Sequence, residues 1–177
     1  MQLRRALAGA LVLALAGLTS CGFDLATDRP YTPSEGTNDD GGEIQIRSAL
    51  VVAAQPNGGT FVVTLVNSAT TEEDGSDPAL TGVSGPNLEV GEFDPIEVGP
   101  NEAVNLATEG GVTMSGDFDA GQMLPLTLTF ADGSTSQLNV PVVPACKEHK
   151  GLDLTEASDN IPYDCDFEPE PAGGEEH

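Results

Sequence analysis

Apolar and polar residues alternate through the middle of the chain, and this period of two predicts β-strands. The first such segment carries apolar or small side chains at every second position, which we assign to one face: Ile44, Ile46, Ser48, Leu50, Val52 and Ala54. A Pro-Asn-Gly-Gly turn at 56–59 and a second apolar run at 61–67 follow. Because both faces of that run are apolar, we predict a central strand antiparallel to the first.

A second hairpin is predicted nearer the C-terminus, around Asp132-Gly133. Apolar residues alternate with polar ones on both sides of this pair: Leu124, Leu126, Leu128, Phe130, Leu138, Val140 and Val142. An Asp-Gly pair between two such runs is typical of a two-residue type I′ turn. Pro141 has no backbone N–H to donate, so the last strand should be an edge strand or carry a bulge at this point.

Shorter apolar segments, separated by glycine and proline, fill the region between the two hairpins. They lie at 80–84, 88–93, 96–98, 103–106 and 112–115. Turn signals at intervals of roughly eight to twelve residues are typical of a β-sandwich. We therefore predict an all-β protein, a small antiparallel β-sandwich over residues 43–145 with one core.

Residues 1–20 have a different pattern. An Arg4-Arg5 pair precedes an apolar run at 6–18 that is too short to span a bilayer, which is the layout of a secretory signal peptide. The following Leu18-Thr-Ser-Cys21 resembles the lipobox of bacterial lipoproteins, whose cysteine is lipidated and begins the mature chain. The resemblance implies a lipoprotein of the cell membrane, held at the extracytoplasmic face by acyl chains such as palmitate on Cys21. The alternative is an ordinary signal peptide with a chance cysteine.

The segments that flank the sandwich are polar. Residues 21–42 contain several prolines and glycines and no apolar period, which indicates a flexible tether behind the lipid. Residues 167–177 are acidic, and we predict a disordered tail.

Two further cysteines bound the segment 146–166. Cys146 and Cys165 are an even pair in an exported chain, where thiols are commonly oxidised. We predict a disulfide that closes this segment as an extension of the domain and stabilises the fold by roughly 3 kcal/mol. A metal or redox site is the alternative, although neither a Cys-x-x-Cys pair nor a second nearby histidine supports it.

The net charge of the chain limits the classes of molecule that it can bind directly. It has 29 acidic and 6 basic residues, net −23, and without residues 1–20 the balance is 29 against 4, or −25. Nucleic acids and anionic membrane surfaces would be repelled, so we expect no nucleic-acid partner and membrane contact through the lipid alone. Acidic clusters at 72–77, 117–119 and 164–170 lack the ordered spacing of a calcium loop, and a solvated acidic surface is the favoured interpretation.

The histidine content argues against an enzyme. Acid–base and nucleophilic catalysis need a base within reach of the reacting group, most often a histidine. Only His149 and His177 are present, and the sequence places no nucleophile beside either. We therefore expect a non-enzymatic protein.

The Gly110-Gly111 pair and the runs at 124–130 and 140–142, with weaker support from 62–67 and 80–84, resemble the PCu(A)C family of copper chaperones. Lipoprotein relatives of that family occur in high-GC Gram-positive bacteria. The resemblance implies a cupredoxin-like or immunoglobulin-like β-sandwich, in agreement with the strand pattern. It also implies binding of Cu(I) outside the cytoplasm and its delivery to copper enzymes such as cytochrome oxidase.

The copper ligands of that family are not matched. Family members hold Cu(I) with two histidines and two methionines, because thioethers suit this soft cation. Thr113 and Ser115 stand where a His-x-Met pair is expected, and Met114 is one residue out of step, which turns it to the opposite face of a strand. We expect Met123 to fill the core, and His149 lies in the cysteine-bounded extension. Met114, Met123 and His149 are therefore weak metal candidates, no cofactor is expected, and copper is implied by the resemblance alone.

The predicted function is that of a binding or interaction module on a membrane anchor, with an envelope protein as its candidate partner. Two alternatives stay open. One is a carrier for copper or another metal with an atypical site, and the other is a structural accessory of a cell-envelope complex.

Overall fold

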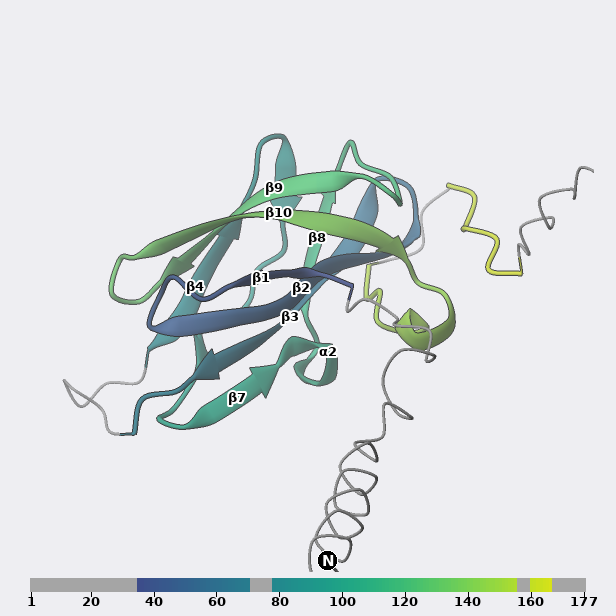
Figure 1. Cartoon of the computed structure of the whole chain (residues 1–177). Coiled ribbons are helices and arrows are strands. Elements are labelled where there is room, and N and C mark those ends of the chain that lie inside the picture. The colour runs from purple at the N-terminus through teal and green to yellow at the C-terminus, as the bar shows by residue number, and fades with distance from the viewer. Residues whose placement is uncertain (1–34, 71–77, 156–159, 167–177) are drawn as a thin grey trace, which may run out of the picture. The chain divides into compact units, whose positions relative to one another are not determined.

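The computed structural model describes residues 35–70, 78–155 and 160–166, and strands dominate it (Figure 1). The strands are β1 (Thr37–Asp39), β2 (Ile44–Gln55), β3 (Gly58–Asn67), β4 (Ala79–Ser84), β5 (Leu88–Val90), β6 (Ile96–Glu97), β7 (Glu102–Asn105), β8 (Val112–Gly116), β9 (Met123–Phe130) and β10 (Thr135–Pro144). A short helix, α2 (Leu106–Glu109), follows β7, and a 3₁₀ turn, η2 (Lys147–His149), follows β10. The all-β prediction is confirmed. Within the described residues, no helix has the length and apolar character needed to cross a membrane.

The strands form one mixed sheet that curls over, so that two layers face each other across a core (Figure 1). Their order is β5-β8-β3-β2-β10-β9-β4-β6, with β1 added to β2 and β7 added to β3. The long apolar run predicted as a central strand is β3, which is confirmed. The predicted antiparallel sandwich contains one parallel pair, in which residues 142–144 of β10 lie beside 51–53 of β2. Parallel neighbours need a long connection, and these two strands are far apart in the sequence.

Pro141 lies where β10 changes partners. It is the last residue of the ladder with β9, opposite Met123, and pairing with β2 begins at Val142. Along 135–141, β10 has a ladder with β9 alone. The proline therefore falls on an edge portion of the strand, as its missing donor predicts.

The strand β2 contains a bulge at Ser48. This residue has a φ of 51°, and the pairing with β3 shifts between Arg47 and Leu50. From Arg47 to Leu50 the chain advances three positions while its partner strand advances two, from Thr64 to Val62. A bulge with one extra residue moves the side chains that follow it to the opposite face of the sheet.

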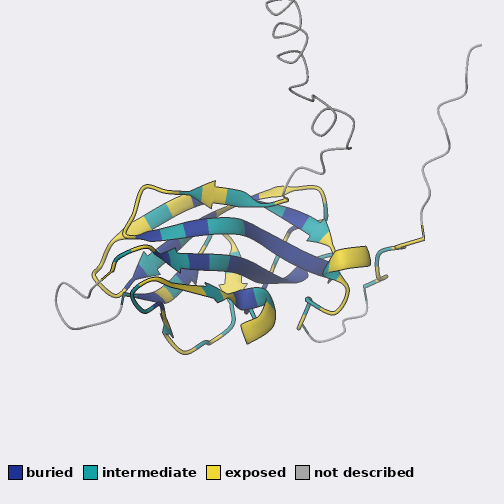
Figure 2. Cartoon of the chain, turned by 60° about the horizontal axis from the view of Figure 1, so that its bottom comes forward, coloured by how far each residue is buried: buried dark blue, intermediate teal, exposed yellow. Residues whose placement is uncertain are grey.

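The bulge divides the apolar residues of β2 between two clusters. The main core takes residues of even number before Ser48 and of odd number after it: Ile44, Ile46, Ala49, Val51 and Ala53. The outer face of β2 carries Leu50 and Val52, which pack with Val62 of β3. The prediction that one face runs unbroken from Ile44 to Ala54 is therefore wrong beyond Ser48. In Figure 2 the buried, dark blue segments lie along the long strands, while exposed segments lie in loops, in the short helices and on parts of some strands.

The strand β1 lies inside the segment predicted as a flexible tether. It pairs with β2 from Thr37, opposite Ala49. The Asn38 Oδ1 accepts a hydrogen bond from the backbone N–H of Ser48 (2.7 Å). Gly36 approaches the same residue so closely that an added Cβ would lie 2.6 Å from the Ser48 carbonyl carbon. The tether prediction is wrong for 37–39, because polar contacts rather than an apolar period hold this strand.

The other terminal predictions fall outside the described residues. They are the signal peptide (1–20), the lipidated Cys21, the tether as far as residue 34, and the tail at 167–177. They stay predictions.

The hairpin of β9 and β10 has the predicted faces but a different turn. Leu124, Leu126, Leu128, Phe130, Leu138, Val140 and Val142 are all buried. The Gly133 N–H donates to the Phe130 carbonyl (2.9 Å), and the Phe130 N–H donates to the Ser134 carbonyl (3.0 Å). In this loop Gly133 alone has a positive φ, 83°. The connection is therefore a three-residue loop that ends in a glycine bulge, and the type I′ prediction, which needs two positive-φ residues, is wrong.

The segment that follows β10, the C-terminal extension (146–166), is attached to the end of β2 by Asp153. The Asp153 carboxylate accepts hydrogen bonds from the backbone N–H groups of Ala54 (2.6 Å) and Thr155 (2.9 Å) and from the Thr60 hydroxyl (3.3 Å). The Ala54 carbonyl in turn accepts the N–H of Tyr163 (2.9 Å). Both backbone groups of Ala54 are thus bonded to the extension, which packs against the domain.

Tyr163 holds the far end of the extension. Its hydroxyl accepts a hydrogen bond from the Ala120 N–H (3.0 Å) and donates one to the Asp119 carboxylate. Burial and the adjacent Asp119 carboxylate raise the pKa of Tyr163 to about 12. Because the neutral phenol is favoured in the folded state, this contribution to stability is present in full below about pH 10 and is lost as the pH rises through 12.

We predict that Asp153→Asn destabilises the fold, because one of its carboxylate acceptors is replaced by an NH₂ group that faces other donors. The expected loss is about 1–3 kcal/mol in the free energy of unfolding. The measurement is urea unfolding of the mature chain, residues 21–177, carrying Cys21→Ser so that it stays in solution. The matched control is Asp166→Asn, since that side chain makes no hydrogen bond with the described residues. Equal midpoints for the two variants would contradict the role of Asp153.

Candidate functional site

The residues at the expected copper position lie on β8. Met114 is 2% exposed and belongs to the main core, whereas Thr113 and Ser115 face outward. The outward face opens into a groove of about 420 Å³, which also contacts the extension at Leu154 and Thr155. Met114, which is one residue out of step with the expected His-x-Met pair, therefore points into the core, as predicted. The outward groups at positions 113 and 115 are hydroxyls, which are poor ligands for Cu(I), so this position does not fit the ion.

The two other metal candidates lie in different environments. Met123 is 54% exposed at the first position of β9, so the expectation that it fills the core is wrong. The core face of β9 begins at Leu124, and alternation turns Met123 outward. His149 lies in η2, where its Nε2 is 2.6 Å from the Glu35 carboxylate. Met114, Met123 and His149 therefore lie on three different elements, β8, β9 and η2, and differ in exposure and surroundings.

Cys146 and Cys165 form a disulfide with their Cα atoms 5.3 Å apart. The bond closes the extension, as the cysteine count indicated. It also adjoins η2, since the His149 N–H donates to the Cys146 carbonyl (2.9 Å).

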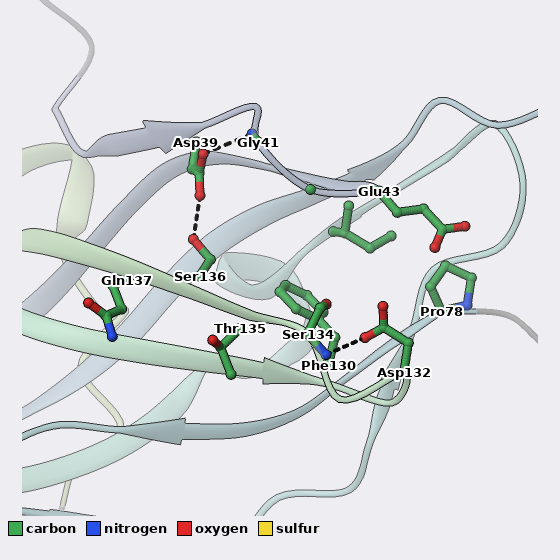
Figure 3. A pocket seen from close by; sticks show the side chains of 12 residues that line it. Asp39, Gly41, Glu43, Pro78, Phe130, Asp132, Ser134, Thr135, Ser136 and Gln137 are labelled. Atoms are coloured by element: carbon green, nitrogen blue, oxygen red, sulfur yellow. Dashed lines mark hydrogen bonds between the residues drawn. The ribbon is translucent and has the colours of Figure 1, made fainter.

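A more enclosed hollow of about 320 Å³ lies between the start of β2 and the β9–β10 hairpin (Figure 3). We call it the acidic pocket, after its three carboxylates, Asp39, Glu43 and Asp132. The remaining lining residues are Gly41, Gly42, Ile44, Pro78, Phe130, Ser134, Thr135, Ser136 and Gln137. In Figure 3, Glu43 and Asp132 lie toward one end of the pocket and Asp39 toward the other. Sequence reasoning missed it because its walls come from three distant segments.

Hydrogen bonds keep two of these carboxylates charged. Asp39 accepts hydrogen bonds from the Ser136 hydroxyl and from the Gly41 N–H (2.9 Å), which lower its pKa. Asp132 accepts hydrogen bonds from Ser134, including its N–H (2.8 Å), and its pKa is also lowered. The lining has no basic residue. The pocket therefore holds net negative charge at neutral pH.

The floor of the pocket is apolar. Phe130 is 8% exposed and Ile44 is 4% exposed. Carboxylates above an apolar floor suit a ligand that has a cationic end and a short hydrocarbon part. An alkylammonium or alkylguanidinium group has this chemistry.

Three solved domains are similar to this chain in fold. The copper-bound PCuAC domain from PmoF2 covers 61% of this chain and 98% of its own, with 19% sequence identity and a TM-score of 0.49. The apo PCuAC domain from PmoF1 covers 61% and 99%, with 15% identity and a TM-score of 0.49. The apo PmoF2 PCuAC domain covers 61% and 95%, with 18% identity and a TM-score of 0.48. In fold, this chain is similar to PCuAC domains. No protein-family model and no curated protein sequence matches it.

Sequence identities this low assign no ligand to this chain, so copper binding has to be tested on its own residues. We predict that it does not retain Cu(I) at the β8 position, since Thr113 and Ser115 offer hydroxyl oxygens and Met114 is in the core. The measurement is competition with a high-affinity Cu(I) chelator under reducing, anaerobic conditions, and the chelator should take all of the copper. Stoichiometric copper retained by the wild type and lost in Met114→Leu, with Met123→Leu as the matched control, would show a copper site on β8.

Proposed function

We propose that this chain is a membrane-anchored extracytoplasmic lipoprotein whose β-domain is a non-enzymatic binding module. The acidic pocket is the proposed binding site, and the ligand group is an alkylammonium or alkylguanidinium cation. The observation that carries the proposal is the pocket itself, with three carboxylates, an apolar floor and no basic residue in its lining. A small amine or a lysine or arginine side chain of an envelope protein can supply this group.

Two features support the location. The Leu18–Cys21 segment has the lipobox pattern, and several acyl chains would hold the protein stably at a membrane. The disulfide between Cys146 and Cys165 suits an oxidising compartment. The net negative charge of the mature chain disfavours direct contact with anionic headgroups, so the lipid would be the attachment.

The chemistry of the pocket favours binding over catalysis. Ser136 donates a hydrogen bond to Asp39, but a carboxylate with a lowered pKa is a weak base at neutral pH. The pair therefore orients the hydroxyl without activating it as a nucleophile. In the described part of the chain the one histidine, His149, is paired with Glu35, at residues that do not line the pocket.

The anchor is tested by Cys21→Ser in the producing cell. We expect the variant to remain unlipidated and to leave the membrane fraction or to stop maturing, because the acyl chains have no other attachment. Fractionation and intact-mass measurement check this. Unchanged membrane retention together with an unchanged mass would remove the lipoprotein proposal.

The pocket is tested by NMR titration of the mature Cys21→Ser chain with n-butylguanidinium. N-butylurea, which is uncharged and of similar shape, is the control ligand. We expect shifts at the pocket for the cation alone and an affinity loss of about tenfold in the double variant Asp39→Asn, Asp132→Asn, equivalent to about 1.4 kcal/mol. Asp117→Asn, an exposed change outside the pocket, is the matched control variant. Similar binding of the two ligands, or equal losses in both variants, would contradict the assignment.

The same titration has a predicted pH dependence. Because the pKa values of Asp39 and Asp132 are lowered, both stay ionised at the pH at which an ordinary aspartate, with a pKa of about 3.9, begins to take up protons, so binding should persist at pH 6 and weaken only in more strongly acidic solution. Loss of binding already near pH 6 would show that other groups hold the ligand.

A further inference from the structure

We propose a divalent-cation site of the zinc class at Glu35, Glu148 and His149, apart from the acidic pocket. One ligand atom from each side chain lies within 4.8 Å of the other two. Glu35 Oε2 and His149 Nε2 are already 2.6 Å apart. The site needs neither the lipid anchor nor the acidic pocket, so its test is independent of the proposed function.

The donor set selects the class of ion. One imidazole nitrogen and two carboxylates are ligands that Zn²⁺ uses, commonly with three protein ligands and water in the fourth position. Ca²⁺ takes six to eight oxygens, and Cu(I) prefers sulfur ligands, so neither matches this set. An ion about 2.1 Å from each ligand atom requires those atoms to lie at most about 4.2 Å apart. The ligand atoms lie within 4.8 Å of one another, so the proposed site requires the two glutamates, which are exposed, to adjust when the ion binds.

The backbone that carries two of the ligands is well supported. Glu148 and His149 are consecutive residues of η2, a turn that begins directly after Cys146 of the disulfide. The Ala145 N–H before them donates to Ala53 of β2 (2.7 Å). The side chain of His149 is only 16% exposed. The imidazole is therefore held at the edge of the domain with its Nε2 directed at Glu35.

The third ligand comes from the other end of the domain. Glu35 precedes Gly36, which packs against Ser48 of β2 at the bulge. The flanking Lys147 and Lys150 form no ion pair within 4.0 Å of either glutamate in the described residues. Neither lysine therefore offsets the negative charge of the two carboxylates. A bound divalent cation would supply the compensating positive charge.

A cation at this position would join the start of β1 to the C-terminal extension. Glu35 lies 14 residues after Cys21 (35 − 21). A chain of that length spans at most about 50 Å, so on a lipidated protein the ion would stay close to the membrane.

The test is calorimetric titration of the metal-free mature Cys21→Ser chain with Zn²⁺. We expect one equivalent to bind, with affinity lower by at least about tenfold in His149→Ala, Glu35→Gln and Glu148→Gln. Glu109→Gln, a change to an exposed glutamate on α2, is the matched control and should bind as the wild type does. Ca²⁺ in the same titration should give no comparable site.

The folded state of each variant is checked by the intact disulfide and by urea unfolding without metal. Equal Zn²⁺ affinity in His149→Ala and the wild type would overturn the site. So would weak binding that falls equally in Glu109→Gln, since it would report the acidic surface as a whole. A variant that fails to fold is replaced by His149→Gln, which keeps the polar side chain and removes the imidazole.

Discussion

The burial of both faces of β2 is the constraint on which the rest of the structure depends. A strand with two apolar faces needs a cover on each side. The inner face is covered by the opposite layer of the curled sheet, and the outer face is covered by α2, the end of β10 and the extension. The bulge at Ser48 determines which side chains of β2 point to the inner core and which point to the outer cluster. The burial of apolar side chains does not by itself decide this, because it favours either face equally. The same bulge receives Gly36 and Asn38, and so it also positions β1.

In the part of the chain that the structure describes, several aspartates are held by backbone N–H donors. Asp39, Asp119, Asp132 and Asp153 each accept a hydrogen bond from a backbone N–H. These hydrogen bonds fix the turns and attachments in which they occur, and at Asp39 and Asp132 they also lower the pKa of the carboxyl group. Asp39 and Asp132 also line the acidic pocket, and there, as in the Glu35 cluster, carboxylates gather where a cation could bind.

Both candidate sites depend on β1. Asp39 at its end contributes to the acidic pocket, and Glu35 just before its start contributes to the proposed metal site. Each meets residues about a hundred positions later in the chain, from the β9–β10 hairpin in one case and from η2 in the other. The three-residue strand β1 therefore places Glu35 and Asp39 at the two candidate sites. Its contacts with Ser48 hold it there.

The sequence by itself determined the elements whose signal is local. The alternation of apolar and polar residues identified the long strands and the buried faces of β9 and β10. The count of cysteines indicated the Cys146–Cys165 disulfide. The position of Met114 in the alternating pattern predicted that its side chain points into the core. Only the tertiary structure decided the reversal at Ser48, the parallel pairing of β10 with β2, and the strand β1 within a polar segment. Apolar periodicity records which side chains are buried, whereas a bulge, a long-range pairing or a shared pocket depends on where distant segments meet. The acidic pocket and the Glu35 cluster belong to that second kind, because each joins residues 35–44 to a segment about a hundred positions later in the sequence.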